Sequence, residues 1–187
     1  MATPTTLPAT FVAGNVLTAA QMNDLRGAFR ILQVVSTTKT DTFTASVASG
    51  GETAVTGLSA SITPSSATSK ILVMLNVNGI ETSDYTSFLV VRLYRGATEI
   101  GSGAAAGSRP TVFGADKTGT QNSDNIVNVS GNYLDSPATT SATTYAVYLV
   151  NTRGVTKTLG VNRTGLDSDQ VSYVRAASTV TLMEVSA

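Results

Sequence analysis

Short segments in which hydrophobic and polar residues alternate run through most of the chain. They are rich in Val and Thr, whose stiff side chains suit a pleated, half-buried surface, and Gly, Pro, Ser and Asp separate them. From Ile31 onward the pattern is one of short β segments, and no later stretch has helical periodicity. The pattern predicts an all-β protein, an antiparallel jelly-roll-like β-sandwich rather than a parallel sheet. The predicted strands are residues 31–35, 40–47, 53–62, 70–78, 87–94, 98–101, 110–114, 125–134, 143–151, 157–162, 171–175 and 179–185.

One stretch near the N-terminus has the spacing of a short amphipathic helix. Thr18 is a good N-cap and Gln21 completes a capping box, while Leu17 and Met22 fit a hydrophobic staple. The predicted apolar stripe consists of Met22, Leu25, Phe29 and Leu32. A helix of about 12 residues is marginal alone in water, so we expect this stripe to dock on a partner surface or on the end of its own domain.

The first ten residues, MATPTTLPAT, form a Thr- and Pro-rich stretch. Such a segment cannot bury its own apolar groups, and it is therefore either disordered or laid against something else. We expect an extended N-terminal arm followed by the helix in residues 1–32, and a β-sandwich domain in residues 33–187.

Three of the predicted strands are apolar on both faces, at residues 71–77, 88–94 and 145–150. A sheet with one solvated face should instead alternate cleanly. Another layer, the arm, a long loop or a neighbouring subunit must cover the second faces. We favour the neighbouring subunit.

Composition excludes several classes of function. The chain has no Cys, which excludes disulfides, thiol catalysis and cysteine–zinc sites, and no His, the commonest metal ligand and general base. The formal net charge is zero, so the basic footprint of a nucleic-acid binder is missing. No apolar run approaches the roughly 20 residues of a membrane-spanning helix, and the N-terminus has no signal-peptide pattern. We expect no cofactor, no metal, no nucleic acid and no membrane insertion.

Acidic residues offer the main candidates for chemistry. Asp167 with Asp169, or Glu81 with Asp84, could form the carboxylate pair of a glycosidase, and Asp167-Ser168-Asp169 could hold calcium. No Trp is present as a sugar platform, and the glycine and distal glutamate of an EF-hand are missing. Solvated turn residues are the favoured interpretation of both pairs, so no catalytic residue is predicted.

Aromatic and Arg side chains at strand ends or in loops are candidate receptor contacts, because Tyr and Arg often anchor recognition surfaces. Ordinary packing of aromatic edges is the alternative. These candidates are Tyr85, Tyr94, Arg95, Arg109, Phe113 and Tyr133.

Four stretches are similar to parts of tailed-bacteriophage virion structural proteins. FVAGNVLTAAQMNDL (residues 11–25) resembles a segment near the N-terminus of many of these proteins. ILQVVSTTKTDTFTAS (31–46), GLSASITPSSATSKILVMLNV (57–77) and STVTLMEV (178–185) resemble their β-rich appendage domains. Together the stretches cover about a third of the chain.

This resemblance implies a non-enzymatic virion protein, assembled in the host cytoplasm. It would be a short fibre or tail appendage, a homotrimer whose N-terminal residues 1–32 bind other virion proteins and whose sandwich projects toward a host glycan or protein. The chain has no long repetitive shaft. A capsid decoration protein, a carbohydrate-binding adhesion module and a hydrolase are the alternatives. The docking residues implied are Phe11, Gly14, Leu17, Thr18, Met22, Asn23, Leu25 and Phe29.

Overall fold

The computed structural model describes residues 14, 16–19, 21–22, 31–82, 88–117 and 126–186. From Ile31 onward, the regular structure within these ranges is entirely β-strand, so the protein is all-β as predicted. The strands are β1 (Ile31–Lys39), β2 (Phe43–Val47), β3 (Glu52–Ile62), β4 (Lys70–Thr82), β5 (Phe88–Arg95), β6 (Thr98–Ile100), β7 (Gly114–Lys117), β8 (Val127–Asp135), β9 (Thr143–Val150), β10 (Lys157–Val161) and β11 (Ser178–Val185).

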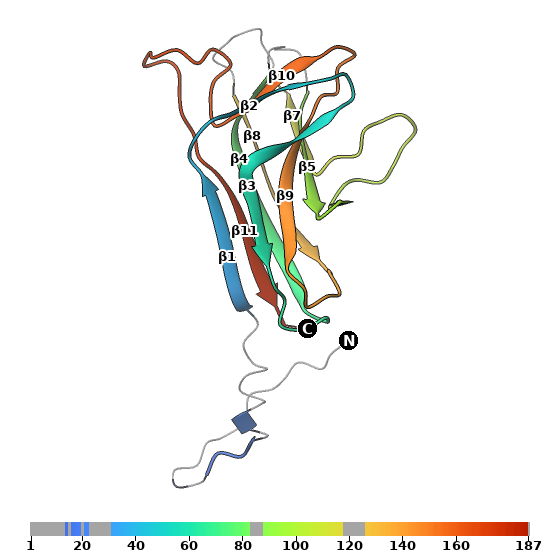
Figure 1. The fold of residues 1–187 in the computed structure, drawn as a ribbon, viewed down its shortest axis with the longest axis vertical. Helices are drawn as coiled ribbons and strands as arrows, with labels where there is room; N and C mark the ends of the chain where they lie inside the picture. The colour runs from blue at the N-terminus through green and yellow to red at the C-terminus, as the bar shows by residue number, and fades with distance from the viewer. Residues whose placement is uncertain are drawn as a thin grey trace.

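The strands form two antiparallel sheets (Figure 1). The six-stranded sheet has the order β1-β11-β4-β10-β2, with β8 paired to the other edge of β4. The five-stranded sheet has the order β3-β9-β5-β6, with β7 also paired to β5. The chain passes repeatedly from one sheet to the other, for example between β3 and β4 and between β8 and β9.

One apolar core lies between the sheets. Alternate residues of each strand point into it, as Val73 and Val77 do in β4 and as Leu93 and Val147 do in β5 and β9, and none of these four side chains is exposed. Each fully buried side chain of this kind contributes about 1.5–3 kcal/mol relative to an exposed one. The alternation of apolar and polar residues in the sequence therefore predicted the buried faces of these strands correctly.

The register of the pairs defines two ends of the molecule. Ile31 pairs with Val185, and Val185 pairs with Lys70, so the chain enters its first strand where its last strand finishes. We call this the entry end, which is the lower end of β1 and β11 in Figure 1, where C marks the end of the chain. At the far end, Phe88 of β5 pairs with Lys117 of β7.

Three sequence predictions are corrected here. Residues 171–175 are not a strand: they form turns with a single bridge from Arg175 to Arg163, and Val171 is fully exposed. The strand predicted at 110–114 lies at Gly114–Lys117 instead, because Pro110 has no N–H for a ladder. Leu32, expected at the end of the helix, belongs to β1, where the register shifts between Ile31 and Gln33.

The second apolar faces have two different outcomes. In the five-stranded sheet, Val90 and Val150 are buried by the chain itself, and Arg92 Nε donates a hydrogen bond at 3.0 Å to the carbonyl of Thr111 in the loop crossing that face. In the six-stranded sheet, the outer side of β4 stays open, and Met74 is 43% exposed. Of the three strands predicted to be apolar on both faces, β4 is therefore the one whose outer side the described chain leaves open along its length.

Candidate functional site

Arg95, a candidate receptor contact, is used inside the protein. Its Nη1 donates to both carboxylate oxygens of Asp135 at the end of β8, and the hydroxyl of Tyr145 donates to Asp135 Oδ2 at 2.7 Å. Asp135 and Tyr145 are buried. Burial and the hydrogen bond to Asp135 raise the pKa of Tyr145 well above its ordinary value. The three side chains hold the two sheets together at the entry end.

Tyr94 lies on the outer face of the five-stranded sheet. Its ring centroid is 4.4 Å from that of Tyr148, and its hydroxyl donates to Glu52 Oε1 at 2.6 Å. Partial burial and this bond raise the pKa of Tyr94 to about 12. Glu52 also forms an ion pair with Arg92 at 2.8 Å, so Tyr94 is one member of a fixed polar group.

Phe113 and Tyr133 fill the side of the core between the two sheets. Both are partly buried against the core cluster. A Cβ added at Gly101 would lie 3.0 Å from the Phe113 ring and 3.2 Å from that of Tyr133, and one at Gly131 would lie 2.9 Å from Phe113. The two glycines leave room for the aromatic rings, which indicates packing rather than recognition.

Two described receptor candidates line open hollows: Arg95 lines one of about 340 Å³, and Arg109 lines a larger one. The larger hollow, of about 640 Å³, lies over the outer face of β5 and β7 toward the far end. The structure does not bring Arg109 together with Tyr94, Arg95, Phe113 or Tyr133, and Tyr85 lies outside the described residues. The larger hollow is lined by Phe88, Val90, Arg109, Pro110, Val112, Ala115, Lys117, Thr152 and Arg153.

The sequence did not single out Phe88, Lys117 or Arg153. Phe88 and Lys117 come together because β5 and β7 pair directly at these positions. Lys117 Nζ lies 5.4 Å from the centroid of the Phe88 ring, a cation–π distance. Lys117 lies three residues beyond the strand predicted at 110–114, so the sequence pattern did not pair it with Phe88.

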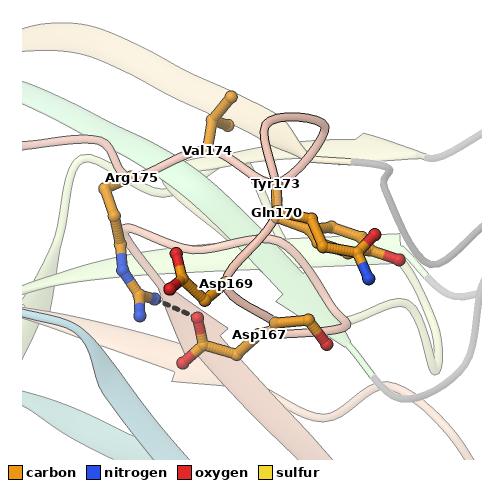
Figure 2. A pocket seen from close by; sticks show the side chains of 7 residues that line it. Asp167, Asp169, Gln170, Tyr173, Val174 and Arg175 are labelled. Carbon is orange, nitrogen blue, oxygen red and sulfur yellow. Dashed lines mark ion pairs between the residues drawn. The ribbon is translucent and has the colours of Figure 1, made fainter.

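Another hollow, of about 300 Å³, is formed by the loop that holds Asp167 and Asp169 (Figure 2). Asp167 is committed to two cations: Arg175 pairs with it closely and Arg163 Nη1 lies 3.6 Å away. A carboxylate neutralised in this way is a poor nucleophile or calcium ligand. Within the described ranges, no group of three His, Cys, Asp or Glu side chains is arranged to hold a metal ion.

Glu81 is a buried carboxyl beside this loop, 3.7 Å from Arg163 Nε. Burial raises its pKa to about 7, against the opposing charge of Arg163 and with a smaller contribution from Asp167. Its position beneath Gly160, where a Cβ would come within 2.5 Å of its carboxylate, leaves no room for a substrate on that side. The partner proposed from the sequence, Asp84, lies outside the described residues.

The predicted capping box is present at the N-terminus of the expected helix. The amide of Thr18 donates to Gln21 Oε1 at 3.0 Å, and the amide of Gln21 donates to Thr18 Oγ1 at 3.2 Å. Leu17 and Met22 are each 47% exposed, and Gly14 has a positive φ of 93°. The other docking candidates, Phe11, Asn23, Leu25 and Phe29, lie outside the described residues.

An open apolar surface lies on the outer face of the six-stranded sheet. A row of paired residues crosses four strands, from Val34 through Met183 and Leu72 to Leu134. Val34 is 55% exposed and Leu134 is 53% exposed. Met74 is next to the row on β4, and we call these five residues the sheet patch. Toward the far end, the same face becomes polar, with Asn76, Ser130 and Thr179 paired across it.

The chain matches no protein-family model, and comparison with curated proteins gave no match. Within the described residues, no helix has the length and apolar character needed to cross a bilayer. The resemblance to phage virion proteins stays a prediction.

Proposed function

We propose that this protein is a non-enzymatic structural protein of a tailed-bacteriophage particle. It is a short fibre or tail appendage in which residues 1–32 form an arm that docks to the particle. The β domain is a jelly-roll-like sandwich that projects as a homotrimer. The resemblance of residues 11–25 to virion proteins supports the docking role, and the capping box at Thr18 and Gln21 supports a helix in that segment.

The observation that carries the proposal is the sheet patch. Five apolar residues share one face of a sheet, and two of them are more than half exposed. Contiguous apolar surface of this kind marks an interaction site in soluble proteins. Its cover is a neighbouring copy of this chain, because the same patch on each subunit can be buried around a closed symmetry axis.

Symmetry connects the patch to the arm. The sheet patch lies toward the entry end, on the same strands whose ends carry Ile31 and Val185. Three subunits packed side by side would bring their three arms to one end and their far ends to the other. That arrangement suits a projecting appendage, which needs one end for the particle and one for its surroundings.

The oligomer is tested by measuring the mass of the full chain in solution by light scattering over a dilution series. We expect a trimer for the wild type and a folded monomer for Leu134→Glu and for Val34→Glu. Ser130→Glu is the matched control, because Ser130 is exposed on the same face but outside the patch. A wild-type monomer at micromolar concentration contradicts the trimer. The wild type would be a monomer if residues 11–30 of the same subunit covered the sheet patch.

The virion role is tested on purified phage particles produced with a tagged protein. Deleting residues 1–30 leaves every strand intact, and we expect the shortened protein to fold but to be missing from particles. Incorporation without these residues would overturn the docking assignment. Electron-microscopic labelling of the tagged full chain distinguishes a tail appendage from a capsid decoration protein, and absence from all particles overturns both.

A further inference from the structure

We propose that the hollow over β5 and β7 binds a carboxylated sugar of the uronic-acid type. The inference depends on the hollow itself and not on a role in a virion. A protein that fails to join particles could still bind this ligand, so the two proposals fail separately.

The floor of the hollow is apolar and is built from strand positions. Phe88 and Val90 point outward from β5, opposite Lys117 and Ala115 of β7. Pro110 and Val112 of the preceding loop complete the wall. Phe88 is 54% exposed, and its ring offers a flat surface on which the C–H face of a sugar ring can lie.

The charges around this floor have one sign. Among the described residues that line the hollow, Arg109, Lys117 and Arg153 are charged and none is acidic. Asp116 is adjacent in sequence, but alternation along β7 turns it to the other face of the strand. The hollow therefore favours an anion, and a guanidinium such as that of Arg109 can bind a carboxylate through two hydrogen bonds.

Arg109 and Lys117 differ in their ion pairing from Arg92 on the same sheet face. Arg92 forms ion pairs with two carboxylates of the protein: its Nη1 lies 2.8 Å from Glu52 Oε2, and its Nε lies 3.4 Å from Glu99 Oε1. Within the described part of the chain, neither Arg109 nor Lys117 forms an ion pair with a carboxylate. These two cations can accept an external carboxylate without giving up an ion pair to a described residue, and Lys117 can do so from its position over the Phe88 ring.

The backbone favours a sugar over an acidic peptide. β5 is paired along this stretch with β7 on one side and with β9 on the other, and Val90 faces both Ala115 and Val150. From Val90 onward, β5 has no unpaired backbone edge at which a peptide strand could be added through main-chain hydrogen bonds. Recognition here depends on side chains, and a volume of about 640 Å³ lies within the usual range for small-ligand sites.

The test titrates the full chain with tetragalacturonate and, as a matched neutral ligand, with its methyl ester, following amide and methyl shifts by NMR. We expect saturable shifts at Phe88, Val90 and Ala115 with the acid and at least about tenfold weaker binding of the ester. Arg109→Gln and Lys117→Gln should each weaken binding of the acid by about fivefold to tenfold. Lys70→Gln, which changes a cation near the entry end, should leave it unchanged.

Each other outcome overturns the proposal. Equal binding of acid and ester would show that the charge of the ligand does not matter. Binding of the acid by the Arg109 and Lys117 variants as tightly as by the wild type would place the ligand elsewhere. Binding of a Glu-rich peptide without binding of the sugar would show that the proposed class of ligand is wrong. No saturable shift with about 10 mM tetragalacturonate would also reject the assignment, because that limit excludes even weak binding.

Discussion

Arg95 of β5 and Asp135 of β8 join the two sheets through one two-pronged contact. Arg95 Nη1 lies 2.8 Å from Asp135 Oδ1 and 2.9 Å from Oδ2, and only 4% of Asp135 is exposed. A buried carboxylate is tolerated only when it is paired and hydrogen-bonded, and Tyr145 supplies the additional bond. The contact therefore fixes how the sheets meet at the entry end.

Removing the carboxylate should be costly. Asp135→Ala leaves Arg95 and the hydroxyl of Tyr145 without their shared acceptor, and we expect the free energy of unfolding to fall by about 3–5 kcal/mol. Tyr145→Phe, which removes one hydrogen bond, should cost about 1–2 kcal/mol. Urea unfolding measures both, with Asp116→Ala on an exposed position as the control. Equal effects of the Asp135 and Asp116 variants would contradict the clamp.

Glu81 should give the protein a pH-dependent stability. Its pKa is raised by burial to about 7, so the folded state keeps a proton that the unfolded chain, with a pKa near 4.5, has already lost. The free energy of unfolding therefore decreases as pH rises between these two values. Glu81→Gln should remove this decrease and be about 2–3 kcal/mol more stable than the wild type at pH 8. Unfolding in urea across pH 4–8 measures the difference.

Glu184 provides the control with the opposite sign. Burial acts to raise its pKa, but hydrogen bonds from Ser65, Gln33 and Ser69 outweigh burial and lower it. Its contribution to stability is present above the unfolded pKa and is lost as pH falls below it. Glu184→Gln should destabilise the protein at pH 7 and have little effect in acid. If both glutamine variants shift stability in the same direction at pH 7, the assignment of Glu81 is wrong.

Gly79 and Gly96 separate backbone strain from crowding. Both adopt a left-handed conformation, with φ of +57° and +56°. A Cβ at Gly79 would lie 2.9 Å from the amide nitrogen of Arg163, whereas one at Gly96 would meet nothing within 4 Å. Gly96→Ala should cost about 1–2 kcal/mol from strain alone, and Gly79→Ala clearly more. Thermal and urea unfolding measure the stability of both variants. Equal losses of unfolding free energy would show that crowding at Gly79 contributes nothing.

Asn162 ties three segments together in the buried region beside β10. Its Nδ2 donates at 2.9 Å to the carbonyls of both Lys39 and Asp41, and its Oδ1 accepts from the Ser178 hydroxyl at 2.6 Å. Asn162→Ala leaves these groups unsatisfied at a residue with φ of +65°. We expect a loss of about 2–4 kcal/mol in urea unfolding. Asn132→Ala, at an exposed position of β8, should stay within about 0.5 kcal/mol of the wild type.

The sequence predicted the strands well because burial on one face leaves a period of two that is visible in the letters. β4 and β11 show this clearly, with Val73 and Leu182 at the centre of their buried faces. The pattern failed at residues 171–175, where Val and Tyr suggested a strand but the chain forms turns with a single bridge from Arg175 to Arg163. β-propensity describes fitness for a sheet and not the presence of a partner.

The candidate binding surfaces were harder to predict, because they depend on pairings between distant residues. Arg95 looked exposed at the end of its strand, yet Asp135, far along the chain, neutralises it. The hollow joins Phe88 to Lys117 and to the loop holding Arg109, which no local pattern relates. The two-sided apolar character of residues 71–77 did give a usable signal, since Met74 lies in the sheet patch.

The pairing of Ile31 with Val185 means that the β domain can be circularly permuted. These two residues are direct neighbours across β1 and β11, so a linker of a few glycines would bridge them. New ends could open at the tight turn around Gly96, where the backbone is uncrowded. A circularly permuted chain would then start and finish between β5 and β6, and every sheet pairing would be kept.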